Sequence, residues 1–115
     1  MLELSLACQD IDRSRPIIDG RVAIEGVRLN VITSRPEEIF QRAFRHQEFD
    51  ISELSLSTHL ITTARGNGPY VAIPAFVSRA FRHNAIYVRK DGGVKRPEDL
   101  RGRAVGVPDV QQTAS

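Results

Sequence analysis

The sequence contains a single cysteine, Cys8, among 115 residues. A lone cysteine cannot form an internal disulfide or a cysteine-based zinc cage, so both frameworks are excluded. No apolar stretch approaches the roughly 20 residues that a membrane-spanning helix needs, and the N-terminal residues lack the basic and apolar regions of a signal peptide. These features predict a chain without a membrane span, located in the reducing cytoplasm.

A strong charge of either sign is also missing, because 16 Lys and Arg residues oppose 14 Asp and Glu residues. Only Lys90 and Lys95 are lysines, so 14 of the 16 cations are arginine, and acidic residues interrupt them along the chain. A nucleic-acid-binding protein usually clusters its cations on one face, so we predict no nucleic-acid partner. Individual arginines can still grip the carboxylates of a small anion through their planar guanidinium forks.

The common catalytic motifs are absent, including the nucleophile elbow, the phosphate loop, the dinucleotide-binding glycine fingerprint and the HExxH zinc motif. The three histidines, His46, His59 and His83, are widely spaced and share no metal-ligand pattern. We therefore predict no metal site.

What is present is an ordinary globular composition, 41% hydrophobic and 26% charged, with room for one modest core. Apolar and β-branched runs alternate with helix-like or turn-like stretches, which predicts an α/β fold with a mainly parallel sheet flanked by helices. The expected strands are residues 2–7, 27–33, 51–56, 70–77, 85–88 and 104–107.

Three helices are expected between these strands. A short one covers residues 13–19, and a longer one begins at Ser34 or Arg35 with Pro36 in its first turn. The buried stripe of the longer helix is Ile39, Phe40, Ala43 and Phe44, with Glu38 and Arg42 paired on its exposed side. A third helix begins near Ser57, turns Leu60, Ile61 and Ala64 inward, and stops at Gly66.

Ligands of parallel α/β sheets bind outside the carboxyl ends of the strands, so candidate site residues are sought there. Residues 8–15, which include Arg13, mix acids and cations after the first strand, although a solvated turn with a helix cap explains them almost as well. Cys8 itself is expected to be a small buried hydrophobe rather than a nucleophile.

A second candidate follows the third strand. Glu53 interrupts an apolar run, and burying a carboxylate is costly unless it is paired or used. Ser55 and Ser57 lie where this strand meets a helix whose free N–H groups could hold an anion, and Ser57 could equally be a structural cap.

A third candidate comprises Arg79, Arg82 and His83, which cluster after an apolar strand. The arginines could hold separate carboxylates, and the histidine could move a proton near neutral pH. An exposed loop with incidental charge is the alternative. Tyr87, in the next run, is expected to pack in the core.

The sequence after residues 105–108 looks like the start of a further helix. A buried parallel strand needs a covering layer, so we expect a fragment or the first lobe of a larger protein. A naturally short domain with a frayed tail is the alternative.

Several of these stretches together resemble the 4,5-dihydroxyphthalate decarboxylase family. They are LSLAC at residues 4–8 with DIDR at 10–13, FRHQEFDISELSLS at 44–57, YVAIP at 70–74 and FRHNAIYV at 81–88. DLRG at 99–102 and VGVP at 105–108 also fit but are more generic, because related solute-binding proteins carry similar patterns.

The resemblance implies a type II periplasmic-binding-protein-like fold, in which residues 1–115 form the first α/β lobe, end near the crossover and lack the second lobe. It implies loss of carbon dioxide from an aromatic ortho-dicarboxylate bearing two hydroxyls, without a cofactor, and this piece alone would be inactive. We fit the residues to that chemistry in three roles: Arg13, Arg79 and Arg82 as carboxylate holders, His83 or Glu53 as proton donor or hydroxyl base, and Ser55 and Ser57 as orienting groups. The alternative is a solute-binding protein or sensor for a small organic anion.

Overall fold

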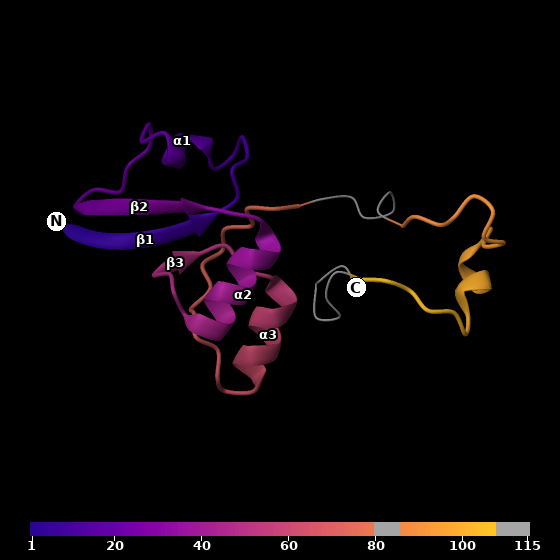
Figure 1. The fold of residues 1–115 in the computed structure, drawn as a ribbon. Helices are drawn as coiled ribbons and strands as arrows, with labels where there is room; N and C mark the ends of the chain where they lie inside the picture. The colour runs from indigo at the N-terminus through magenta and orange to yellow at the C-terminus, as the bar shows by residue number, and fades with distance from the viewer. Residues whose placement is uncertain (80–85, 108–115) are drawn as a thin grey trace.

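The computed structural model describes residues 1–79 and 86–107. At its centre, strand β1 (Leu2–Cys8) pairs in parallel with β2 (Val27–Thr33) along its whole length and with β3 (Ile51–Ser52) at its carboxyl end. The strand order is β2-β1-β3 (Figure 1). Because all three strands run in the same direction, their carboxyl ends lie at one edge of the sheet.

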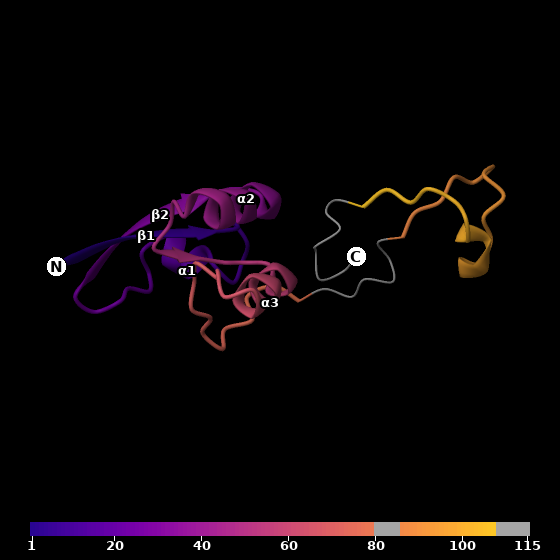
Figure 2. The ribbon, with the colours of Figure 1, turned by 90° about the horizontal axis from the view of Figure 1, so that it is seen from below.

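Helices flank this sheet on both sides. Helix α2 (Pro36–His46) lies on one side, and α1 (Arg15–Ile18) and α3 (Leu56–Ala64) lie on the other (Figure 2). A short 3₁₀ helix, η2 (Pro97–Leu100), falls in the second described range. The predicted α/β class with a mainly parallel sheet and flanking helices is confirmed.

The core lies between β1 and α2. Ala7 from the sheet meets Ile39 and Ala43 from the helix and Phe49 from the loop that follows, and all four are buried. The Arg42 guanidinium lies over the Phe49 ring, 4.9 Å from its centroid. Partly buried apolar side chains pack around the cluster: Ile32, Phe40, Leu54 and Tyr70.

The opposite face of the sheet is also apolar, because alternate residues of a strand share a face. Val27, Leu29 and Val31 of β2 line a cavity of about 320 Å³ there, and α1 with the loop that follows it forms the other wall. The face toward α2 is apolar only at the carboxyl end, at Ala7 and Ile32, because the exposed ion pair of Glu3 and Arg28 lies on it near the amino end.

The sequence signals for α2 are confirmed. Pro36 occupies its first turn, Glu37 and Glu38 lie at the positive end of the helix dipole, and Arg42 binds Glu38 at 3.3 Å. Ile39 and Ala43 are fully buried, while Phe40 and Phe44 are half-buried. Local chemistry was sufficient here because cap, dipole and periodicity agree.

The prediction for α3 was partly wrong. The helix begins at Leu56 with Ser55 as its N-cap residue, so Ser57 lies inside it. Leu60 is 58% exposed and Ala64 is exposed, whereas Ile61 is half-buried. The face turned toward the protein carries the buried Ser55 and the half-buried Thr58, His59 and Thr62 instead. Of the three apolar residues predicted for the buried face, only Ile61 is half-buried.

Several expected strands are also corrected. β3 stops at Ser52 rather than residue 56, and residues 70–77, 86–88 and 104–107 are not strands, while residue 85 lies outside the described residues. Val71 is 94% exposed and Tyr87, expected in the core, is 88% exposed. A strand needs a neighbour for its backbone groups, and no described strand lies beside these runs.

Candidate site at the carboxyl edge of the sheet

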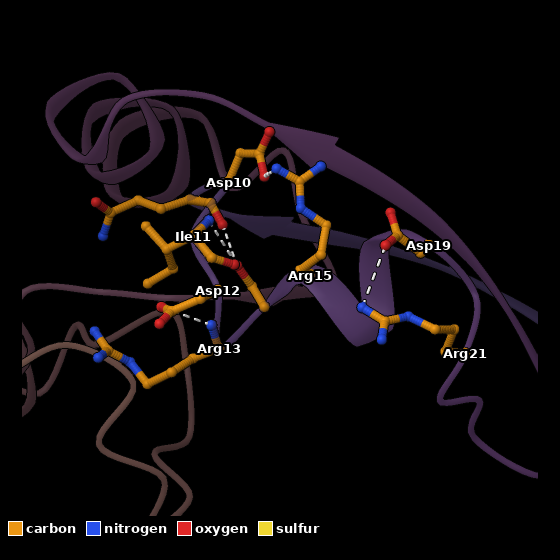
Figure 3. A network of polar contacts seen from close by, with 9 residues as sticks. Asp10, Ile11, Asp12, Arg13, Arg15, Asp19 and Arg21 are labelled. Atoms are coloured by element: carbon orange, nitrogen blue, oxygen red, sulfur yellow. Dashed lines mark hydrogen bonds and ion pairs between the residues drawn. The ribbon is translucent and has the colours of Figure 1, made fainter.

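The turn after β1 is held together by its own polar side chains (Figure 3). The Ser14 hydroxyl donates to the Gln9 carbonyl and lies 3.1 Å from the Ile11 carbonyl, and it accepts the Ile11 N–H at 3.2 Å. Asp10 binds Arg15 at 2.5 Å. Helix α1 consequently starts at Arg15 rather than at residue 13, and the turn presents Arg13 ahead of it.

Arg13 joins this turn to a distant segment. Its backbone N–H donates to Asp12 Oδ1 at 3.0 Å, and its Nε donates to the Val77 carbonyl at 2.8 Å. Among the residues that the structure describes, neither terminal nitrogen of its guanidinium has a hydrogen-bond partner. The side chain is anchored at Nε and is able to offer its remaining donors to an anion.

Glu53 lies directly beyond β3 and next to β1. Its backbone N–H donates to the Ala7 carbonyl at 3.1 Å, which extends the ladder by one residue. Its side-chain Oε1 is buried and has no hydrogen-bond partner among the described residues. Burial raises the pKa of the neighbouring Cys8 thiol, and the negative charges of Glu53 and Asp10 raise that pKa further, against a smaller opposing effect of the Ser14 hydroxyl. Cys8 is therefore a buried, protonated thiol, as predicted.

Ser55 and Ser57 lie at the junction of β3 and α3. Ser55 is buried, and its hydroxyl is 3.1 Å from that of Ser57. Ser55 is the N-cap residue by backbone conformation but makes no side-chain capping bond. The first N–H groups of α3 therefore face this edge of the sheet without a side-chain cap from Ser55.

The structure thus brings four of the predicted residues to the carboxyl edge of the sheet: Arg13, Glu53, Ser55 and Ser57. Arg79 is exposed and follows Val77 by two residues, so the Arg13 bond connects its segment to the same edge. Arg82 and His83 lie outside the described residues.

The sequence analysis missed His59. Its Nδ1 atom is buried and has no hydrogen-bond partner among the described residues. It lies four residues after the buried Ser55, so both belong to one face of the helix. That spacing was a usable signal, but the histidines were tested only for metal-ligand patterns.

Within residues 1–79 and 86–107, no group of three or more His, Cys, Asp or Glu side chains is arranged to hold a metal ion. In the same ranges, no helix has the length and apolar character that crossing a membrane requires.

No known protein-family model matches the chain. The chain is 53% identical over 114 residues to a 4,5-dihydroxyphthalate decarboxylase from Comamonas testosteroni, a match that covers 99% of this chain and 34% of that protein. It is 51% identical over 114 residues to a protein of the same name from Pseudomonas putida, covering 99% of this chain and 44% of the relative. The resemblance of the chain to the 4,5-dihydroxyphthalate decarboxylase family is confirmed over almost its whole length.

The chain spans about a third of one curated relative and under half of the other. All four residues gathered at the carboxyl edge of the sheet fall inside the matched stretch.

Proposed function

We propose that the complete protein containing this chain decarboxylates an aromatic ortho-dicarboxylate, converting 4,5-dihydroxyphthalate to a dihydroxybenzoate. The observation that carries the proposal is the identity of 53% and 51%, across 99% of the chain, with two proteins of that name. The carboxyl edge of the sheet supports it, because an anchored guanidinium and a buried carboxylate are groups that such a reaction can use.

We propose further that residues 1–115 form the first α/β lobe of a two-lobe, binding-protein-like fold and end near the crossover to the second lobe. The greater length of both relatives supports this arrangement. The substrate would lie between the lobes, at the carboxyl edge of this sheet. The absent lobe of the same polypeptide would supply the other half of the site.

The arginines in this proposal hold the two carboxylates of the substrate. Arg13 offers its terminal nitrogens, and Arg79 and Arg82 are further holders. Ser55 and Ser57 orient the ligand by hydrogen bonds. A planar guanidinium fork binds a carboxylate with two parallel hydrogen bonds, which fixes the plane of the attached ring as well as its position.

Decarboxylation then requires a proton at the ring carbon that bears the leaving carboxylate. A base takes the proton of the hydroxyl para to that carbon, and the electron pair moves into the ring as the carbon accepts a proton. The carbon–carboxylate bond breaks, carbon dioxide leaves, and its bonding pair restores the aromatic ring. In this proposal Glu53 acts as the hydroxyl base and His83 as the proton donor.

The substrate class follows from this chemistry: a small anionic aromatic acid of phthalate breakdown. A cytoplasmic location is part of the same proposal and is supported by the single, buried and unpaired Cys8, a composition typical of reducing compartments.

The test uses the complete protein mixed with 4,5-dihydroxyphthalate, with carbon dioxide release and the ultraviolet spectrum of the product followed together. We expect saturable turnover. Arg13→Ala should raise KM about 10- to 100-fold, the effect of losing a hydrogen bond to a charged group. Arg82→Ala should do the same, and His83→Ala should lower kcat about 100-fold or more.

Arg21→Ala is the matched control for Arg13→Ala. Arg21 is exposed and, among the described residues, binds only Asp19, two positions away, so its loss should leave KM and kcat unchanged. Saturable binding without carbon dioxide release would contradict the proposal and identify a receptor for an organic anion instead.

A further inference from the structure

Two buried side-chain polar atoms have no hydrogen-bond partner in the described part of the chain: Glu53 Oε1 and His59 Nδ1. Folded proteins satisfy nearly all such atoms, and leaving one unpaired costs free energy comparable to a lost hydrogen bond. Each exception therefore requires an explanation. Both atoms fall within one seven-residue stretch that leads from β3 into α3.

The backbone directs both residues to the carboxyl edge of the sheet. Glu53 is fixed there by the hydrogen bond from its N–H to Ala7. The His59 N–H donates to the Ser55 carbonyl at 3.0 Å, which places His59 one turn above the buried N-cap residue on the same helix face. Side chains of a helix lean toward its N-terminus, so the imidazole leans toward that same edge.

The nearby hydroxyl groups give neither atom a hydrogen-bond partner. Ser55 Oγ is engaged with Ser57 Oγ at 3.1 Å. Thr62 Oγ1, on the next turn of the His59 face, donates to the carbonyls of Thr58 and His59. At the carboxyl edge of the sheet, a carboxylate oxygen and an imidazole nitrogen are therefore available to bind a group from outside the described residues.

Both atoms can accept a hydrogen bond: a carboxylate oxygen always, and Nδ1 when the neutral imidazole carries its proton on Nε2. The complementary ligand presents two hydroxyl donors. We propose that Glu53 and His59 form the hydroxyl-binding end of the site, in which the two neighbouring ring hydroxyls of an aromatic acid donate to Glu53 Oε1 and His59 Nδ1. This assignment rests on the proposed function, because it takes the ligand to be the same dihydroxylated acid.

The assignment makes His59 a specificity-determining residue. Arg13 would hold the carboxylate end of the ring, and Glu53 with His59 would select for hydroxyls at the other end. A site built to hydrogen-bond a hydroxyl strongly rejects the analogue that lacks it, because the buried acceptors are then left unpaired. Phthalate, which has the carboxylates without the hydroxyls, is that analogue.

The experiment measures, by calorimetry on the complete protein, the ratio of the dissociation constants for phthalate and 4,5-dihydroxyphthalate. We expect a ratio of at least about 100 in the unmodified protein. His59→Leu should lower the ratio about tenfold or more by weakening only the dihydroxylated ligand, with phthalate affinity unchanged. His59→Gln, which restores a polar acceptor, should recover part of the ratio.

The control variant is His46→Leu, at an exposed histidine in the last turn of α2, which should leave the ratio unchanged. Glu53→Gln is the second variant, should His59→Leu fail to fold. It retains one acceptor oxygen but loses the negative charge, so the ratio should fall in this variant also, and thermal unfolding reports the folding of each variant.

Carbon dioxide release measured on the same samples separates this proposal from the decarboxylase function. A ratio that depends on His59, without carbon dioxide release, would support the hydroxyl-binding pair and overturn only the decarboxylase function. Turnover with an unchanged ratio in His59→Leu and Glu53→Gln would overturn only the pair. Equal affinity of the unmodified protein for the two ligands, or binding of neither, would also overturn the pair.

Discussion

Asp50 shows how a single exposed carboxylate joins β1 to the loop before β3. Its Oδ2 atom accepts the Ser5 N–H at 2.8 Å and the Ser5 hydroxyl at 2.7 Å, and its own N–H donates to Ser5 Oγ at 2.9 Å. The bond from the Ser5 N–H, followed by that from the hydroxyl, lowers the pKa of Asp50 below its usual value. The ionised carboxylate of Asp50 is therefore more stable in the folded state than in the unfolded chain.

This shift predicts a specific pH dependence of stability. Because the pKa of folded Asp50 is lowered, its contribution is complete above the unfolded pKa, near pH 4, and is lost as pH falls through the folded pKa. In urea titrations of the complete protein between pH 5 and 2, Asp50→Asn should therefore lose less stability on acidification than the unmodified protein.

Ser5→Ala provides a graded comparison, because it removes the hydroxyl but keeps the N–H donor, and it should give an intermediate pH dependence. Glu25→Gln, at an exposed carboxylate outside this network, should retain the full dependence. If the free energy of unfolding fell equally with pH in Asp50→Asn and in the unmodified protein, Asp50 would not be the source of this pH dependence.

The residues of the candidate site were only partly predictable from sequence. Glu53 was found because a carboxylate in an apolar run is energetically conspicuous. The hydrogen bond from Arg13 to the Val77 carbonyl joins residues 64 positions apart and depends on tertiary structure, so no local sequence pattern predicts it. His59 was missed because its significance arises from burial beside Ser55, and burial follows from how α3 packs rather than from its composition.

Helix α2 ends in a backbone conformation that favours glycine. Its C-cap residue, Gln47, has φ of 51° in the left-handed region, and its N–H bonds to the Ala43 carbonyl. A side chain in this region clashes with its own backbone, whereas glycine does not. Gln47→Gly should therefore raise the free energy of unfolding by about 0.5–1 kcal/mol, measured by urea denaturation of the complete protein.

Gln41→Gly is the matched control on the same helix. Gln41 is an exposed residue in the interior of α2, where glycine adds only conformational entropy to the unfolded chain. This variant should lose about 1 kcal/mol. If both variants lost stability equally, the left-handed conformation of Gln47 would not be what limits this helix end.

The elements that sequence predicted best are those whose signals are local. β1 and β2 carry alternating apolar residues and pair along their full length, and α2 has its proline, acids and apolar stripe in the expected order. β3 is short because β1 ends at Cys8, so Glu53 is the last residue that finds a backbone partner there. The run at residues 70–77 has strand-like composition, but a strand also needs a neighbouring strand to bind its backbone groups. Composition does not reveal whether such a neighbour is present.

At the scale of the whole molecule, apolar side chains are unevenly covered. Ile39 and Ala43 of α2 are fully buried, whereas Val71, Ile73 and Phe76 are each more than 70% exposed. These exposed residues belong to the segment that Arg13 holds through Val77. The proposed second lobe would cover this side and bring further donors to the site, since ligand pockets enclose most of the surface of a small ligand.

The 115-residue chain and the complete protein should therefore differ in ligand binding as well as in catalysis. With Arg13 exposed to water and without the proposed second lobe, a charge-assisted bond to a carboxylate contributes little net affinity. We expect the complete protein to bind 4,5-dihydroxyphthalate at least about 100-fold more tightly, the equivalent of two such bonds formed out of water. Calorimetry on both proteins, with circular dichroism to establish that the shorter chain is folded, measures the difference. A folded 115-residue chain that bound the acid within threefold of the complete protein would place the whole binding site within this α/β unit and remove the need for a second lobe.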